Sequence, residues 1–153
     1  MLHYSWQVFG DCGHLNNDDN KPLNEYFNLP CDKGCVFNSD LPHGLTENNH
    51  CKYTIRKTHK PAMLSIHTAV VNNGICYNME GELVDCRSPF GKIIWKNAYV
   101  KHFLTQDTKT FKERRFNKLD ACGNLAATND KLIERYFNLN KRTKEKEELF
   151  YAK

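Results

Sequence analysis

The sequence lacks the motifs that most often identify an enzyme or a membrane protein. It contains no glycine-rich phosphate-binding loop, no HExxH motif, no CxxC redox pair and no G-x-S-x-G nucleophile elbow. No apolar run approaches the roughly 20 residues that a membrane-spanning helix needs. These absences argue against the common nucleotide-binding, zinc-protease and serine-hydrolase classes, and we expect no membrane partner.

A secretory signal is also missing from the N-terminus. Residues 1–10 have no charged start, no apolar middle and no small-residue cleavage site. Despite the many asparagines, no Asn-X-Ser/Thr sequon occurs. If Met1 is the natural start, we therefore expect an intracellular protein of the cytoplasm or nucleus.

The length and composition predict one folded domain over residues 1–153. At 40% hydrophobic residues the chain is too apolar for a disordered protein, and its length suits a single core. It divides by composition into an acidic Cys/His-rich lobe (1–50), a β-rich part (51–87) and a basic helical part (92–153). The predicted class is α+β, with a loop-dominated N-terminal lobe and C-terminal helices that cover the sheet.

Alternating apolar and polar residues indicate strands in two places. A short strand is predicted over 4–9, and a four-stranded antiparallel meander over about 51–87. Asn72-Asn73-Gly74 and a turn centred on Gly81 would connect its later strands. In that hairpin Cys76 would face Cys86, with Cβ atoms about 4.5–5.5 Å apart, slightly wide for a disulfide. We therefore expect two thiols on one face, or a strained disulfide under oxidising conditions.

Helical spacing dominates the rest of the chain. One or two turns are predicted over 23–29, before Pro30. The segment 92–104 fits either a strand or a helix, and helix is preferred. A basic amphipathic helix is predicted over about 108–119, and a last helix begins at Thr128 or Asn129 and runs to about Asn140.

Positive charge is concentrated behind the first 50 residues. Those carry five Asp and two Glu against two Lys, a net charge of −5, whereas the remaining chain carries 20 Lys or Arg against 11 acids, a net charge of +9. A basic surface attracts nucleic acid or an acidic protein face. An ordinary solvated helix surface is the commoner alternative. The predicted polyanion contacts are Lys52, Arg56, Lys57, Lys112, Arg114, Arg115 and Lys118.

Seven cysteines, an odd number, are spread along the chain. In a reducing compartment, buried thiols or metal ligands are expected before disulfides. Zinc takes four thiolate or imidazole ligands, often in pairs two to four residues apart on a turn, and Cys31-x-x-x-Cys35 has that spacing. Because the spacing matches no zinc-finger signature, plain buried thiols remain the alternative. The candidate zinc ligands are Cys12, His14, Cys31, Cys35, His50 and Cys51.

Three functional hypotheses follow. The leading one is a non-catalytic protein that contacts nucleic acid or an acidic partner through its basic C-terminal two-thirds, with zinc as a stabilising ion. The second is a small nuclease or nucleotide-processing enzyme, with a base among His50, His59 and His67 and an acid such as Asp85 or Glu82. The third is a protein–protein interaction factor of the host-targeting viral type, with the apolar tip Leu149–Tyr151 as its partner site.

Overall fold

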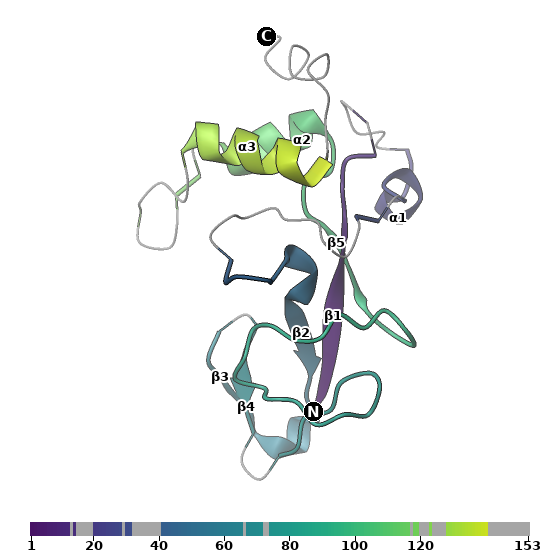
Figure 1. Ribbon diagram of the computed structural model, residues 1–153, viewed down its shortest axis with the longest axis vertical. Coiled ribbons are helices and arrows are strands. Elements are labelled where there is room, and N and C mark those ends of the chain that lie inside the picture. Colours follow the sequence, from purple (N-terminus) through teal and green to yellow (C-terminus); the bar gives the residue numbers. More distant parts are fainter. Residues whose placement is uncertain are drawn as a thin grey trace. The chain divides into compact units, whose positions relative to one another are not determined.

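The chain folds into an α+β structure made of two compact units (Figure 1). The first unit comprises Met1–Gln7 and Leu41–His102, and the second comprises Val8–Asp40 and Phe103–Lys153. This computed structural model describes residues 1–12, 14, 20–28, 30–31, 41–65, 67–71, 74–116, 118–119, 123 and 128–140, without the side chains of residues 59 and 63. The unit boundaries cut across the three parts predicted from composition, because residues 1–7 belong to the first unit and residues 8–40 to the second.

A mixed three-stranded sheet has the order β2-β1-β5. Its strands are β1 (Leu2–Phe9), β2 (Cys51–Thr54) and β5 (Val100–Phe103), and β1 is the purple strand of Figure 1. β1 and β2 are antiparallel, and Leu2 pairs with Thr54 and Ser5 with Cys51. The strand predicted over 4–9 is thus confirmed, and it lies at the centre of the sheet.

The predicted meander is only partly present. Instead of one strand over 62–71, the chain forms β3 (Ala62–Met63) and β4 (Ala69–Val70), which pair with each other. The turn between them is closed by Ser65 and Thr68, whose hydroxyl oxygens are 2.8 Å apart and whose backbones are hydrogen-bonded. These local bonds reverse the chain where the apolar pattern alone favoured a continuous strand. The predicted turn at 72–73 lies outside the described residues.

The hairpin around Gly81 is shifted by one residue from the prediction. Tyr77 pairs with Leu83, and the Val84 amide donates to the Cys76 carbonyl at 3.0 Å. Gly81 has a φ of +83°, which places it at the end of a three-residue loop rather than at its centre. Cys76 therefore faces Val84 instead of Cys86, and both cysteines are free thiols.

The helix preferred for 92–104 is wrong. This segment forms no helix: residues 92–99 are irregular, with a bend at Lys96–Asn97, and Val100–Phe103 forms β5. β1 supplies hydrogen bonds to the start of the segment. The Ser5 hydroxyl donates to the Lys92 carbonyl at 2.8 Å and accepts from the Ile94 amide at 3.1 Å. The Trp95 indole N–H donates to the Trp6 carbonyl at 2.8 Å. These long-range bonds select the non-helical alternative that the local composition also allowed.

The second unit contains all three α-helices of the described residues. They are α1 (Leu23–Tyr26), α2 (Thr108–Arg115) and α3 (Asn129–Asn140), close to the predicted ranges, although α2 ends four residues earlier. Asp107 caps α2 by accepting a hydrogen bond from the Thr110 amide at 2.9 Å. Within this unit the helices pack on the N-terminal lobe.

A buried polar chain joins α3 to that lobe. The Tyr136 hydroxyl donates to the Asp11 carboxylate at 2.6 Å and lies 2.9 Å from the Thr108 hydroxyl oxygen. The Asn140 side chain accepts from the Asp11 amide at 2.8 Å. Tyr136 and Asp11 are both buried, so these bonds are shielded from water.

Replacing Tyr136 with Phe removes the buried donor to Asp11 and leaves the ring in place. We expect Tyr136→Phe to lower the free energy of unfolding by about 1–3 kcal/mol, measured by urea unfolding with circular dichroism at 222 nm. The matched control is Tyr77→Phe, because Tyr77 is exposed. A Tyr136→Phe protein as stable as the wild type would contradict this role.

Candidate functional site

The predicted polyanion contacts fall on both units. Lys52 lies on β2, and Arg56 and Lys57 lie at the start of the 3-10 turn η2 (Lys57–His59). The other four belong to the second unit, on α2 and just after it. Within the described part of the chain, no carboxylate forms an ion pair with Arg56, Lys57 or the nearby Lys60. Those three side chains are exposed cations.

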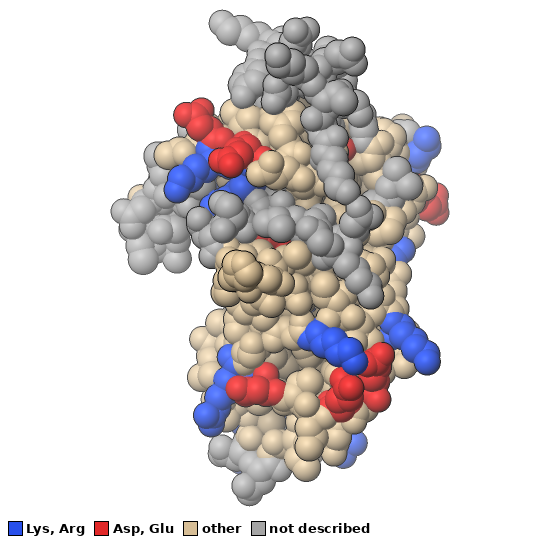
Figure 2. All heavy atoms as spheres, viewed as in Figure 1, with Lys and Arg blue, Asp and Glu red and all other residues tan. Residues whose placement is uncertain are grey.

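Other basic side chains are neutralised. Figure 2 shows Lys and Arg beside Asp and Glu at several places on the face it draws. The ammonium of Lys92 lies 2.6 Å from the Glu80 carboxylate and 3.4 Å from that of Glu82, and Lys109 pairs with Glu113 at 4.0 Å. The predicted basic stretch over 92–118 is therefore only partly available to a polyanion.

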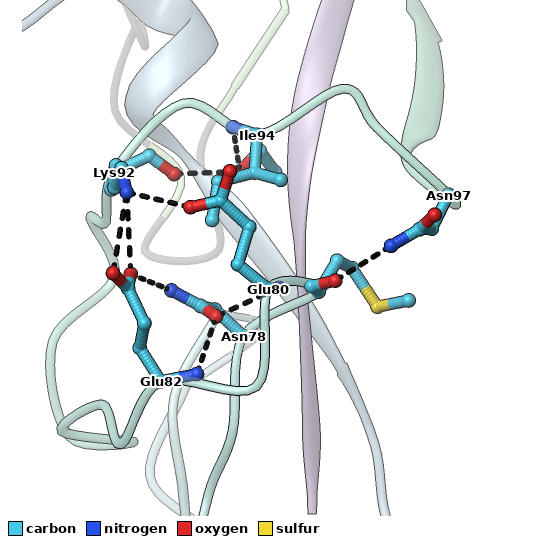
Figure 3. Close-up of polar contacts among 8 residues, drawn as sticks. Asn78, Glu80, Glu82, Lys92, Ile94 and Asn97 are labelled. Atoms are coloured by element: carbon cyan, nitrogen blue, oxygen red, sulfur yellow. Dashed lines mark hydrogen bonds and ion pairs between the residues drawn. The ribbon is translucent and has the colours of Figure 1, made fainter.

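Asn78, in the hairpin turn, positions the two glutamates that pair with Lys92 (Figure 3). The Asn78 side chain accepts from the amides of Glu80 and Glu82 and donates to the Glu82 carboxylate at 2.7 Å. Hydrogen bonds to Glu80 and then Glu82 raise the pKa of Lys92, and those from Asn78 and Lys92 lower the pKa of Glu82. We interpret this cluster as a structural clasp between the turn and the segment that follows it.

Imidazole rings surround Trp6 on β1. The ring centroid of His50 lies 4.9 Å from that of Trp6, and the centroid of His102 lies 3.9 Å from it, both stacked. The Trp6 amide donates to the His50 carbonyl at 2.9 Å, so His50 sits across from Trp6 just before β2. The two imidazoles come from the two sides of β1, because β2 follows His50 and β5 contains His102.

A third imidazole, His67, completes what we call the histidine cluster (Trp6, His50, His67 and His102). Its ring centroid lies 5.1 Å from that of Trp6 and 5.2 Å from that of His50. All three histidines are partly exposed, whereas Trp6 is buried. Segments far apart in the sequence therefore bring three proton-exchanging groups to one place.

Two of the rings are held through the same nitrogen. Nδ1 of His50 lies 3.2 Å from the carboxylate and 3.2 Å from the carbonyl of Glu47, a buried residue of the 3-10 turn η1 (Glu47–Asn49). Nδ1 of His67 lies 3.0 Å from the Cys51 carbonyl. Because these partners only accept, both Nδ1 atoms carry hydrogen, and Nε2 is left to exchange a proton with a ligand.

The surroundings of His67 favour its neutral form. Burial is the main cause that lowers the pKa of His67, and the positive charge of Lys52 lowers it further, whereas the bond to the Cys51 carbonyl and the charge of Glu47 oppose this. The Lys52 ammonium also lies 5.9 Å from the Trp6 ring centroid. A basic imidazole nitrogen and an ammonium group thus border the same indole.

Sequence reasoning found part of this cluster. His50 and His67 were candidates, whereas Trp6, His102 and Glu47 were missed. The carboxylates proposed as acids lie elsewhere: Glu82 pairs with Lys92, and Asp85 accepts from the Arg87 amide at 2.9 Å. The side chain of His59 lies outside the described residues. The spacing of Glu47 and His50 on one turn was the only local signal for the missed acid.

The six predicted zinc ligands are divided between the units. His50 and Cys51 belong to the first unit; Cys12, His14 and Cys31 belong to the second; and Cys35 lies outside the described residues. The Cys51 thiol is fully buried, donates to the Pro89 carbonyl at 3.0 Å and has a pKa raised by burial. Among the described residues, no group of three or more His, Cys, Asp and Glu is arranged to hold a metal ion. Zinc therefore stays a prediction.

We expect the imidazole of His67 to titrate below its ordinary pKa of 6.5 in the folded protein, because burial disfavours the imidazolium. The unfolded chain then binds this proton more readily, so the free energy of unfolding decreases as the pH falls below 6.5. NMR titration of the His67 ring, in buffer and in urea, measures both midpoints. A folded midpoint at or above the urea value would contradict the described environment.

Comparison of the chain with protein-family models, with curated proteins and with solved structures finds no match. Within the described residues, no helix combines the length and the apolar character that crossing a membrane requires. The apolar tip Leu149–Tyr151, the predicted protein-partner site, lies outside the described part of the chain. The case for a function consequently depends on the histidine cluster and the cations beside it.

Proposed function

We propose that the protein binds nucleic acid through the basic side chains of its first unit, Lys52, Arg56 and Lys57. The observation that carries this proposal is the group of exposed cations Arg56, Lys57 and Lys60 at η2, with which no described carboxylate forms an ion pair. Phosphate contacts need such cations, and they supply most of the non-specific affinity for nucleic acid. The basic face of α2, with Lys112, Arg114, Arg115 and Lys118, is a second contact region in this proposal.

Single-stranded nucleic acid suits the first unit better than a duplex. Proteins that bind single strands combine a positively charged surface with flat rings on which bases stack. Here Lys52 lies over the Trp6 ring, and the partly exposed rings of His50 and His67 pack against the same indole. The carboxylates of an acidic protein could pair with the cations, but they would not stack on the rings as bases do. Stacking on the rings therefore distinguishes a nucleic-acid partner from an acidic protein.

The triple variant Lys52→Gln/Arg56→Gln/Lys57→Gln tests the binding proposal. We expect it to weaken binding of a labelled single-stranded oligonucleotide at least tenfold in fluorescence anisotropy. The slope of log Kd against log salt should fall by about 0.7 for each phosphate that the variant no longer neutralises. The control Lys92→Gln/Lys109→Gln removes charge from lysines that already pair with glutamates, and it should bind nearly as the wild type does.

Unchanged affinity and salt slope in the triple variant would refute the proposed contact. Equal affinity of the wild type for polyglutamate and for the oligonucleotide would instead indicate an acidic protein partner. Neutralising the four basic residues of α2 and its C-terminal flank, in a separate protein, measures the contribution of the second unit.

Cleavage of RNA is a second candidate function, and the geometry of His50 and His67 favours it. Their rings are 5.2 Å apart, and each is anchored through Nδ1. In this reaction Nε2 of His67 takes the proton of the ribose 2′-hydroxyl, and the 2′-oxygen attacks the adjacent phosphorus. The bond to the 5′-oxygen breaks, and that oxygen takes a proton from Nε2 of His50. The products are a 2′,3′-cyclic phosphate and a 5′-hydroxyl.

Neighbouring groups fit this assignment. Glu47 orients the imidazole of His50, and the Lys52 ammonium can stabilise the negative charge that develops on the phosphoryl oxygens. The nucleophile belongs to the substrate, so two imidazoles and a cation are sufficient for the proton transfers. His102 would hold Trp6 in place by stacking on its ring.

We expect His67→Ala and His50→Ala each to lower the rate of RNA cleavage by about 10²–10⁴-fold at saturating RNA, beyond the loss of affinity for the corresponding DNA strand that removal of a stacking ring causes. The DNA strand itself should not be cleaved, since it has no 2′-hydroxyl. His43→Ala is the control, because His43 is exposed and belongs to another loop. Cleavage that leaves no cyclic phosphate, or that survives both substitutions, would reject the mechanism, and wild-type protein without cleavage would leave binding as the function.

A further inference from the structure

A short segment of the first unit, residues 88–92, is hydrogen-bonded to η1 and β2. We call it the strap. The Gly91 amide donates to the Asn49 carbonyl at 2.9 Å, and the Asn49 side chain donates back to the Gly91 carbonyl at 3.0 Å. The Cys51 amide and thiol both donate to the Pro89 carbonyl, at 3.2 and 3.0 Å. The Tyr53 hydroxyl donates to the Ser88 carbonyl at 2.8 Å, and the Ser5 hydroxyl donates to the Lys92 carbonyl at 2.8 Å. Among the described residues, the strap pairs with the sheet side only through the single bridge between Phe90 and His50.

His3 lies directly against the strap and is buried, with only 3% of its surface exposed. A Cβ atom added to Gly91 would come 2.2 Å from the His3 ring carbon Cε1, so only glycine allows the strap to approach this closely. The ring also stacks on Tyr53, with centroids 5.2 Å apart. The imidazole is thus packed against the backbone of the strap and against β2.

Neither ring nitrogen of His3 has a hydrogen-bond partner among the described residues. A neutral imidazole tolerates this position, but an imidazolium would bring a full charge and a second N–H donor into it. Burial alone lowers the pKa of His3, and no neighbouring charge takes part. Tyr53, the titratable group stacked on the ring, is itself kept neutral because burial raises its pKa.

We propose that His3 is an acid-sensitive switch and that its protonation releases the strap. The charged ring can be hydrated only if it moves out or the strap lifts. His3 is fixed on the central strand β1, whereas the strap forms only a single bridge and no strand, so the strap is the part that moves. Release uncovers two groups. The Cys51 thiol loses its Pro89 acceptor, and Phe90 leaves the edge of the His50 ring, where their centroids are 4.8 Å apart.

This inference concerns the conformation of the first unit and does not require that nucleic acid be its ligand. If the strap opens on acidification, the histidine cluster becomes more accessible from the His50 side. The equilibrium constant for opening should rise about tenfold for each pH unit below 6.5, since one proton is taken up on opening. The equilibrium constant stops rising once the pH falls below the lowered pKa that His3 has in the closed state.

Thiol labelling of the intact protein tests the switch. Cys51 is modified with 4,4′-dithiodipyridine, which reacts at acid pH, and the labelled peptide is quantified by mass spectrometry from pH 7.5 to 5. At each pH, the labelling rate of the folded protein is divided by the rate of the same thiol in urea. This removes the pH dependence of the reaction between thiol and reagent. We expect the corrected Cys51 rate to rise about tenfold per pH unit below 6.5, while that of Cys31, in the second unit, stays level.

Two variants separate the switch from general acid unfolding. His3→Phe keeps a flat ring against Gly91 but cannot be protonated, and its Cys51 labelling should lose the pH dependence. Gly91→Ala should lift the strap at every pH and give fast labelling already at pH 7.5. A wild-type rate that is independent of pH would overturn the proposal, as would an unchanged slope in His3→Phe. If His3→Phe does not fold, the wild-type slope and Gly91→Ala still decide the question.

Discussion

The backbone pairing of β1 with β2 determines which side chains meet in the first unit. The register Leu2 to Thr54 and Ser5 to Cys51 places His3 opposite Tyr53 and brings Trp6 across from His50. A slip of one residue would turn every one of these side chains to the other face of the sheet. The histidine cluster and the packing of His3 under the strap therefore depend on the same set of hydrogen bonds.

β1 has a second effect through the segment that follows the hairpin. Ser5 and Trp6 bind residues 92–95 through side-chain and carbonyl bonds, and this draws the chain into β5. As a result His102, on β5, stacks on Trp6. A central strand at the N-terminus thus collects histidines that lie more than fifty residues apart in the chain.

The parts of the fold that sequence predicted well are those with local causes. α3 has an amphipathic pattern with an acidic first turn, and β1 alternates before a glycine, so both could be identified from their own residues. The non-helical course of 92–104, which ends in β5, could not, because the bonds that hold it come from Ser5 and Trp6. The hairpin shift at Gly81 arose from loop geometry, which apolar alternation does not encode.

The candidate site also combines features that are visible in the local sequence with features that arise only in the folded chain. Exposed cations at Arg56 and Lys57 were visible in the sequence, but the neutralisation of Lys92 by two glutamates required the folded hairpin. His50 and His67 were candidates as residue types, whereas their common contact with Trp6 is a tertiary property. Charge sorting along the chain was consequently a weaker guide to the site than the pairing of its strands.

The most direct measurement of this account is the set of NMR contacts made by the Trp6 indole. A nuclear Overhauser spectrum of the labelled protein, with ring signals assigned by His50→Gln and His102→Gln, reports which imidazoles touch it. The described register predicts cross-peaks from the indole protons to both rings, each absent in its own variant. Indole cross-peaks to neither histidine would contradict the register and the site built on it.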